Sequence, residues 1–311
     1  MYYDIAAELS SLFDLSRTIP KLTLFFIAAS GILLLCSCVG LVLMTKRHVG
    51  LRFFPVLYGA TAYLLFFVII GSFLSGLISL TIPENADTAT IAIIRFIMLL
   101  VTSSLIVGGR FFAMWFIRKY YSEYCDAYGI GVGVSITEAI ITGITVFINY
   151  CLCITLNSSG LEALVNSYDT VEEATAQLNS VLIFYNNPSY TYLLSGIESI
   201  MFLVFNTLIS VMFYSLWTGK LKKIHLLSII GLQTAIYLPG SFYSSGVIFN
   251  NIGCFLIEVL IFAACTLLFL RIHNTYFKNI EPPAGTHKDQ NKNSSSKSGK
   301  KMPDFNKNIN V

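Results

Sequence analysis

Seven long apolar stretches, separated by short polar segments, dominate the hydrophobic pattern of this chain. A helix rises about 1.5 Å per residue, so about 20 apolar residues are needed to cross the hydrocarbon layer of a membrane. Each stretch reaches that length, and the pattern therefore predicts seven transmembrane helices. Their expected bounds are 22–45, 53–82, 91–117, 128–156, 190–217, 224–248 and 250–272.

The fourth and sixth stretches are the least regular. The fourth begins with a glycine-rich run, YGIGVGVS, and the sixth is interrupted by Pro239 and Gly240. The gap between the sixth and seventh stretches is very short, so a single broken segment is the alternative to two separate helices. Proline removes a backbone hydrogen bond from a helix, and Pro239 is therefore the expected position of a kink.

The composition points to lipid as the surrounding solvent. Of the 311 residues, 55% are hydrophobic and only 12% are charged, whereas a soluble domain carries about 25% charged residues. We therefore expect an all-α membrane protein, a seven-transmembrane helix bundle in the plasma membrane. The lipid bilayer is its expected partner, and no nucleic acid is expected to bind.

The distribution of basic residues predicts the orientation. Sixteen of the twenty lysines and arginines fall in the segments on one side of the predicted helices, and two fall in those on the other. Lysine and arginine are enriched in cytoplasmic loops. The count predicts an extracellular N-terminus and a cytoplasmic C-terminus, which requires an odd number of helices.

Three regions follow from this topology. Residues 1–21 form an extracellular segment without the pattern of a cleaved signal peptide. Residues 22–272 form the transmembrane domain, and residues 273–311 form a cytoplasmic tail, disordered from about residue 281 because it is polar and rich in lysine. The acidic loop 157–189 begins with a glycosylation sequon at Asn157 on the predicted outer face.

Three ionisable residues lie in the predicted outer third of the membrane: Arg95 on the third helix, Glu198 on the fifth and Glu258 on the seventh. A charge in the bilayer is costly, by about 2.5–3.5 kcal/mol on insertion scales, and marks a function or a pair. One interpretation is a ligand pocket that contains all three. The other is a structural ion pair, with Arg95 extending to the headgroups.

Arg110 and Glu138 are the ionisable residues of the inner half, on the third and fourth helices. Their depths are similar, so Glu138 is the nearest candidate partner of Arg110. The pair could simply hold two helices together. Alternatively, it could be an activation switch that loosens when the helices shift and frees Arg110 for a cytoplasmic partner.

The run GRFFAMWFIRKYY, with Arg110 near the cytoplasmic end of the third of seven helices, resembles a motif of G-protein-coupled receptors. It is similar to the pattern of nematode serpentine chemoreceptors of the Sra/Sre superfamily, on which Arg110, Ala113 and Tyr120 or Tyr121 fall. Gly109 stands where that family usually has an acid. The resemblance implies an outer pocket for a small-molecule or peptide ligand and a cytoplasmic surface for a heterotrimeric G protein.

These observations favour a chemosensory G-protein-coupled receptor, without enzymatic activity and without a cofactor. The alternative is a transporter or channel in which Arg95, Glu198 and Glu258 line the path. An intramembrane enzyme is the third possibility. It is disfavoured because no histidine lies in the apolar core and no metal-ligand spacing occurs, so no metal site is expected. A retinal-binding photoreceptor is disfavoured more strongly, since no predicted helix contains a core lysine to form a Schiff base.

Overall fold

The computed structural model describes residue 9 and residues 13–82, 87–245, 247–248 and 250–277. Across these residues seven helices are long and apolar enough to cross a membrane, which confirms the seven-helix bundle. Their bounds are α2 Lys21–Val49, Phe53–Ser79, α5 Thr88–Ile117, α6 Tyr124–Val165, α9 Tyr190–Trp217, α10 His225–Ser244 and α11 Asn251–Tyr276. The second of them consists of α3 Phe53–Tyr63, a π-helical stretch Leu64–Gly71 and α4 Ser72–Ser79.

The sixth and seventh helices are separate, so the alternative of one broken segment is not realised. Pro239 lies inside α10, which continues through it to Ser244. The fourth helix is longer than predicted, because α6 begins with a capping box between Glu123 and Asp126 and continues past the membrane-spanning length. Gly160 interrupts α6 with a φ of 79°, a left-handed conformation that favours glycine.

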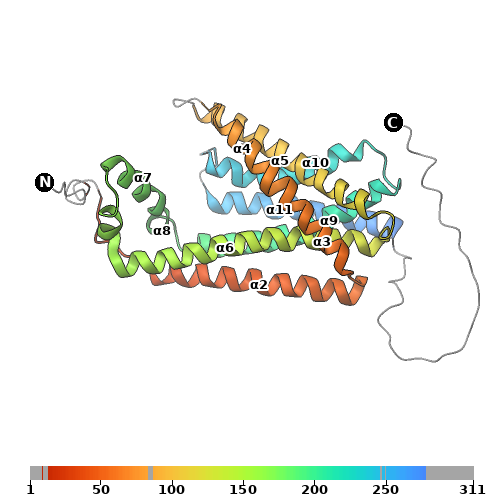
Figure 1. Cartoon of the computed structure of the whole chain (residues 1–311), viewed down its shortest axis with the longest axis horizontal. Coiled ribbons are helices and arrows are strands. Elements are labelled where there is room, and N and C mark those ends of the chain that lie inside the picture. The colour runs from red at the N-terminus through yellow and green to blue at the C-terminus, as the bar shows by residue number, and fades with distance from the viewer. Residues whose placement is uncertain (1–8, 10–12, 83–86, 246, 249, 278–311) are drawn as a thin grey trace, which may run out of the picture.

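Helix α6 is the longest helix among the described residues, Tyr124–Val165. It runs beside α2 over most of its length (Figure 1) and also packs against α3 and α9. Two short helices, α7 Val171–Val181 and α8 Ile183–Asn186, follow its far end and lie at the end of the bundle where α2 begins. They share a separate apolar core with the ends of α2 and α6, formed by residues such as Ile27, Leu161 and Leu178.

The glycine-rich run at the start of α6 allows the closest helix contacts. A Cβ atom on Gly129 would lie 2.7 Å from Pro55 Cβ, and one on Gly133 would lie 2.0 Å from the Val56 carbonyl oxygen. Gly131 faces the opposite side, where a Cβ would lie 2.8 Å from Thr207 Cα. Small residues four positions apart let membrane helices approach each other closely. The run therefore seats α6 between α3 and α9.

A salt-bridge network joins the starts of α3 and α6. Arg52 lies 2.6 Å from Glu123 and 3.3 Å from Asp126, whose side chain is almost fully buried. Partial burial lowers the pKa of Arg52. The hydrogen bond to Glu123 and the charge of Asp126 raise the pKa by more than burial lowers it, so the net pKa lies above its usual value. The guanidinium therefore stays charged and holds this end of the two helices together.

Removing Arg52 should have a small effect. Arg52→Ala is expected to lower the free energy of unfolding by about 1 kcal/mol, because the pair with Glu123 is exposed and screened by solvent. Thermal unfolding of the purified protein would measure this loss, with Arg47→Ala, an exposed arginine at the end of α2, as the matched control. Equal melting temperatures for the two variants would contradict the assigned role.

The orientation of the termini stays a prediction, since no membrane is part of the structure. The predicted disordered tail from about residue 281 lies outside the described residues, as does most of the predicted extracellular segment. All seven cysteines are free thiols.

Candidate functional site

A cluster of polar side chains occupies the interior of the bundle between α5, α6, α9 and α10. Arg110 on α5 is its centre and is 0% exposed. Its guanidinium donates three hydrogen bonds: Nε to Ser210 Oγ at 3.0 Å, Nη1 to Gln233 Oε1 at 2.9 Å and Nη2 to Asn206 Oδ1 at 2.5 Å. All three partners are themselves buried. The guanidinium thus ties α5 to α9 and α10.

Glu138 on α6 is the carboxylate of this cluster. Asn206 Nδ2 donates a short hydrogen bond to Glu138 Oε2, and the Tyr237 hydroxyl donates one of 2.9 Å to Oε1. Both carboxylate oxygens are therefore held, one from α9 and one from α10. Unlike Arg110, the Glu138 side chain is only partly buried. We call Arg110, Glu138, Asn206, Ser210, Gln233 and Tyr237 the polar cluster.

The predicted pairing of Arg110 with Glu138 is indirect. No salt bridge joins them within the described part of the chain; Asn206 connects them, since it accepts from Arg110 and donates to Glu138. Both charged residues were predicted in the inner half of the membrane, whereas the neutral members of the cluster were not predicted. Amides are uncommon in apolar helices, and Asn206 and Gln233 could have been noticed on that ground.

The two glutamates predicted for the outer third line the same cavity. Glu198 on α9 and Glu258 on α11 both line a cavity of about 310 Å³. Arg95 lies on α5 and is not among the described residues that line this cavity. Of the three residues predicted for one pocket, Glu198 and Glu258 thus line this cavity and Arg95 does not.

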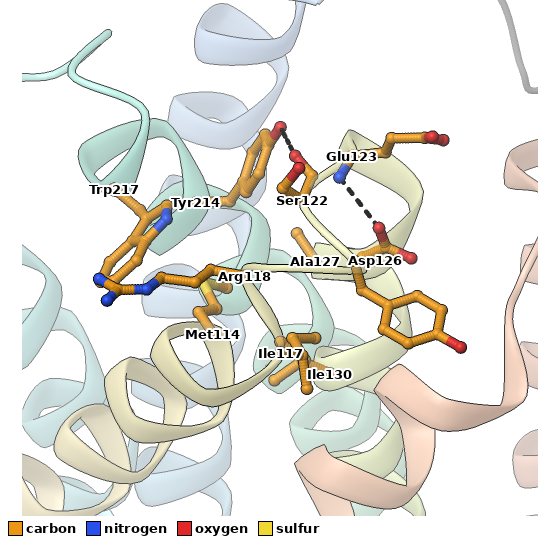
Figure 2. Close-up of a pocket in the computed structure, with 11 residues that line it drawn as sticks. Met114, Ile117, Arg118, Ser122, Glu123, Asp126, Ala127, Ile130, Tyr214 and Trp217 are labelled. Atoms are coloured by element: carbon orange, nitrogen blue, oxygen red, sulfur yellow. Dashed lines mark hydrogen bonds between the residues drawn. The ribbon is translucent and has the colours of Figure 1, made fainter. Parts of the chain in front are cut away.

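At the opposite end of the bundle, where α5 turns into α6, polar groups surround a small hollow. Figure 2 shows the Tyr214 hydroxyl directed at the Ser122 carbonyl and the Asp126 carboxylate at the backbone N–H of Glu123. These hydrogen bonds measure 2.9 Å each. The hollow between these groups has a volume of about 10 Å³, which is room for about one water molecule. It cannot accept an organic ligand.

The remaining predicted site residue is Asn157. It lies on α6, where its Oδ1 accepts a hydrogen bond of 2.7 Å from the backbone N–H of Ile19 and its Nδ2 donates one of 3.0 Å to the Ile19 carbonyl. A glycan on Nδ2 would have to displace this contact. Glycosylation of Asn157 stays a prediction.

Across the described residues, no group of three or more histidine, cysteine, aspartate or glutamate side chains could hold a metal ion. The polar cluster supplies one carboxylate, Glu138, and its positive charge comes from Arg110.

A comparison with protein-family models identifies a family for most of this chain. Residues 32–261, more than half of the chain, match the model described as YhfC intramembrane metalloprotease. The matched range contains the whole polar cluster and both cavity glutamates. No curated protein and no solved structure gives a significant match.

This match overturns the functional predictions made from the sequence. The matched family is not a serpentine chemoreceptor family, so the resemblance of the Arg110 run was misleading, and receptor signalling through a G protein is not supported. The transporter alternative gains no support either. The expectation of a chain without enzymatic activity was also wrong, because the family is described as a protease. The multi-pass membrane protein itself stands.

Proposed function

Because the chain belongs to the YhfC intramembrane metalloprotease family, we propose that it has a membrane protease-like function, with the polar cluster as its reactive site and Glu138 as the reacting group. The observation that carries this proposal is the state of Glu138: a carboxylate deep in the bundle, fixed by two donors from different helices and still partly exposed. We also propose the plasma membrane as its location.

The family description implies a metal ion, and the described residues do not fit one. Protein zinc sites use three or four histidine, cysteine or carboxylate ligands. The polar cluster has a single carboxylate, no histidine and no cysteine, and no other described group reaches three such ligands. In addition, the buried guanidinium of Arg110 would repel a second cation in the same cluster.

A fixed carboxylate can promote hydrolysis of a peptide bond without a metal. Glu138 would accept a proton from a water molecule as the water oxygen forms a bond to the peptide carbonyl carbon. The same carboxyl group would then give this proton to the amide nitrogen as the C–N bond breaks. The products are a carboxylic acid and an amine. A positioned acid–base group of this kind contributes about 100-fold to 10,000-fold in rate.

Arg110 is a positioning residue in this scheme. It is fully buried, and its three hydrogen bonds go to Ser210, Gln233 and Asn206 instead of to an open surface. Through Asn206 it fixes the direction in which the Glu138 carboxylate points.

The test is proteolysis by the purified protein in lipid nanodiscs, with a library of fluorogenic peptides and transmembrane-segment substrates. Glu138→Gln keeps the shape of the side chain but removes the base, and it should reduce the cleavage rate by about 100-fold or more. Glu162→Gln, an exposed glutamate on the same helix, is the matched control and should cleave at the wild-type rate.

A chelator gives the second arm of the experiment. Wild-type cleavage should persist after treatment with EDTA, because the described residues of the cluster do not form a metal site. Loss of cleavage with EDTA and recovery with zinc would contradict the assignment of a metal-independent site. Equal rates for Glu138→Gln and the wild type would remove Glu138 from its role.

A further inference from the structure

The cavity lined by Glu198 and Glu258 is separate from the polar cluster, and the proposed hydrolysis does not use it. It lies near the end of the bundle at which α9 and α11 begin. Its volume of about 310 Å³ is at the lower end of the range for small-molecule sites, about 300–1,000 Å³. The cavity is therefore large enough for a small organic group.

Two carboxyl groups, those of Glu198 and Glu258, line this cavity. Glu198 and Glu258 interact with each other, and two ionised carboxylates in contact repel each other. No lysine, arginine or histidine is found among the described residues that line the cavity. The wall thus provides no counter-ion for its two acids.

Glu258 is also incompletely hydrogen-bonded. Its side chain is 2% exposed, and its Oε1 accepts a hydrogen bond of 3.6 Å from the Cys254 thiol. Its Oε2 has no hydrogen-bond partner. A buried carboxylate oxygen without a donor is unfavourable by about 1–3 kcal/mol or more. Glu258 Oε2 therefore lacks a hydrogen-bond donor. A positively charged donor would form this hydrogen bond and would also be a counter-ion for the carboxyl groups.

The rest of the wall indicates what kind of cation fits. Apolar side chains from three helices, Ile27, Val146 and Leu194, lie beside neutral polar ones such as Asn149 and Tyr243. A metal ion bound by oxygen takes six or more oxygen ligands, and no described group of three or more histidine, cysteine, aspartate or glutamate side chains could hold one here. An alkyl chain, by contrast, gains from contact with the apolar side chains.

We propose that this cavity binds a protonated primary amine. An ammonium group has three N–H donors, enough to reach Glu258 Oε2 and the Glu198 carboxylate at once, while the alkyl part lies against Ile27, Val146 and Leu194. This site does not depend on the protease-like function, because it needs no step of that reaction and its test is a binding measurement.

The experiment is equilibrium binding of n-butylammonium to the full chain in nanodiscs, with neutral 1-butanol as the probe of equal shape. Saturable binding of n-butylammonium and none of 1-butanol is the expected result. Glu258→Gln and Glu198→Gln should each weaken binding by about tenfold or more, since each removes one charged acceptor. Glu162→Gln should bind like the wild type.

One further probe identifies the source of the amine. N-acetyl-lysine N-methylamide presents the ammonium group as a lysine side chain does. If it binds as tightly as n-butylammonium, the site is assigned to a peptide lysine. If only n-butylammonium binds, the site is assigned to a free amine. Three results would overturn the proposal. They are binding of 1-butanol as tight as that of n-butylammonium, binding by Glu198→Gln as tight as by the wild type, and displacement of the amine by calcium at a concentration lower than that of the amine. A complete lack of binding would also overturn it, and would mean that the two carboxyl groups share a proton.

Discussion

Gly133→Ala is expected to destabilise the folded protein by about 3 kcal/mol or more, at the upper end of the range for overpacked interiors. The added Cβ would lie 2.0 Å from the Val56 carbonyl oxygen and 2.8 Å from the Ala60 nitrogen. Both atoms are backbone atoms of α3, so no side-chain rotation relieves the contact and the two helices must separate. Denaturant-dependent unfolding in detergent micelles would measure the change.

Gly143→Ala is the matched control on the same helix. A Cβ there meets only Leu34 Cδ2, at 4.0 Å, and alanine is a better helix former than glycine by about 1 kcal/mol. This variant should be as stable as the wild type or slightly more stable. If Gly133→Ala unfolded at the same denaturant concentration as Gly143→Ala, the close packing of α3 against α6 would be wrong.

Arg110→Met is expected to reduce the free energy of unfolding by about 3–5 kcal/mol, the usual loss when one partner of a buried charged network is removed. Ser210, Asn206 and Gln233 would lose their shared partner, and Glu138 would keep a charge inside the bundle without the nearby guanidinium. Thermal unfolding monitored by circular dichroism would give the difference. Arg110→Lys should recover only a part of it, because an ammonium cannot reach three acceptors on two helices in the same geometry.

A double-mutant cycle tests whether Asn206 couples the two charges. Glu138→Gln removes the carboxylate charge. The double variant Arg110→Met/Glu138→Gln should therefore lose less free energy of unfolding than the two single variants lose in sum. The cavity lined by Glu198 and Glu258 offers a comparison. The effects of Arg110→Met and Glu258→Gln on stability should be additive, since neither residue contacts the other's partners. An additive result for the first pair would mean that Asn206 transmits no coupling.

The helices were predictable because they depend on local composition. A run of about 20 apolar residues crosses a membrane whatever surrounds it, and all seven runs became helices. The errors lie at the ends: α6 starts at Tyr124, earlier than the expected 128, because Glu123 and Asp126 cap it. The cap depends on two side chains meeting the backbone, which hydropathy does not record.

The site was only half predictable. Arg110, Glu138, Glu198 and Glu258 are visible in the sequence as costly charges in apolar helices. Depth along a helix gives one coordinate, however, and the direction around the helix axis is set by packing against the neighbours. For this reason depth matched Arg110 to Glu138 but could not show that Asn206 stands between them, and it grouped Arg95 with two acids whose cavity it does not line.

The resemblance to receptors failed for a related reason. It rested on a dozen residues and on the count of helices, and many functions share a seven-helix architecture. By itself the sequence determined that the chain is a membrane-spanning helix bundle, because hydropathy is a property of each segment alone. Only the tertiary structure decided which polar groups meet, because the partners of Arg110 come from α9 and α10 and are 96 or more positions away along the chain.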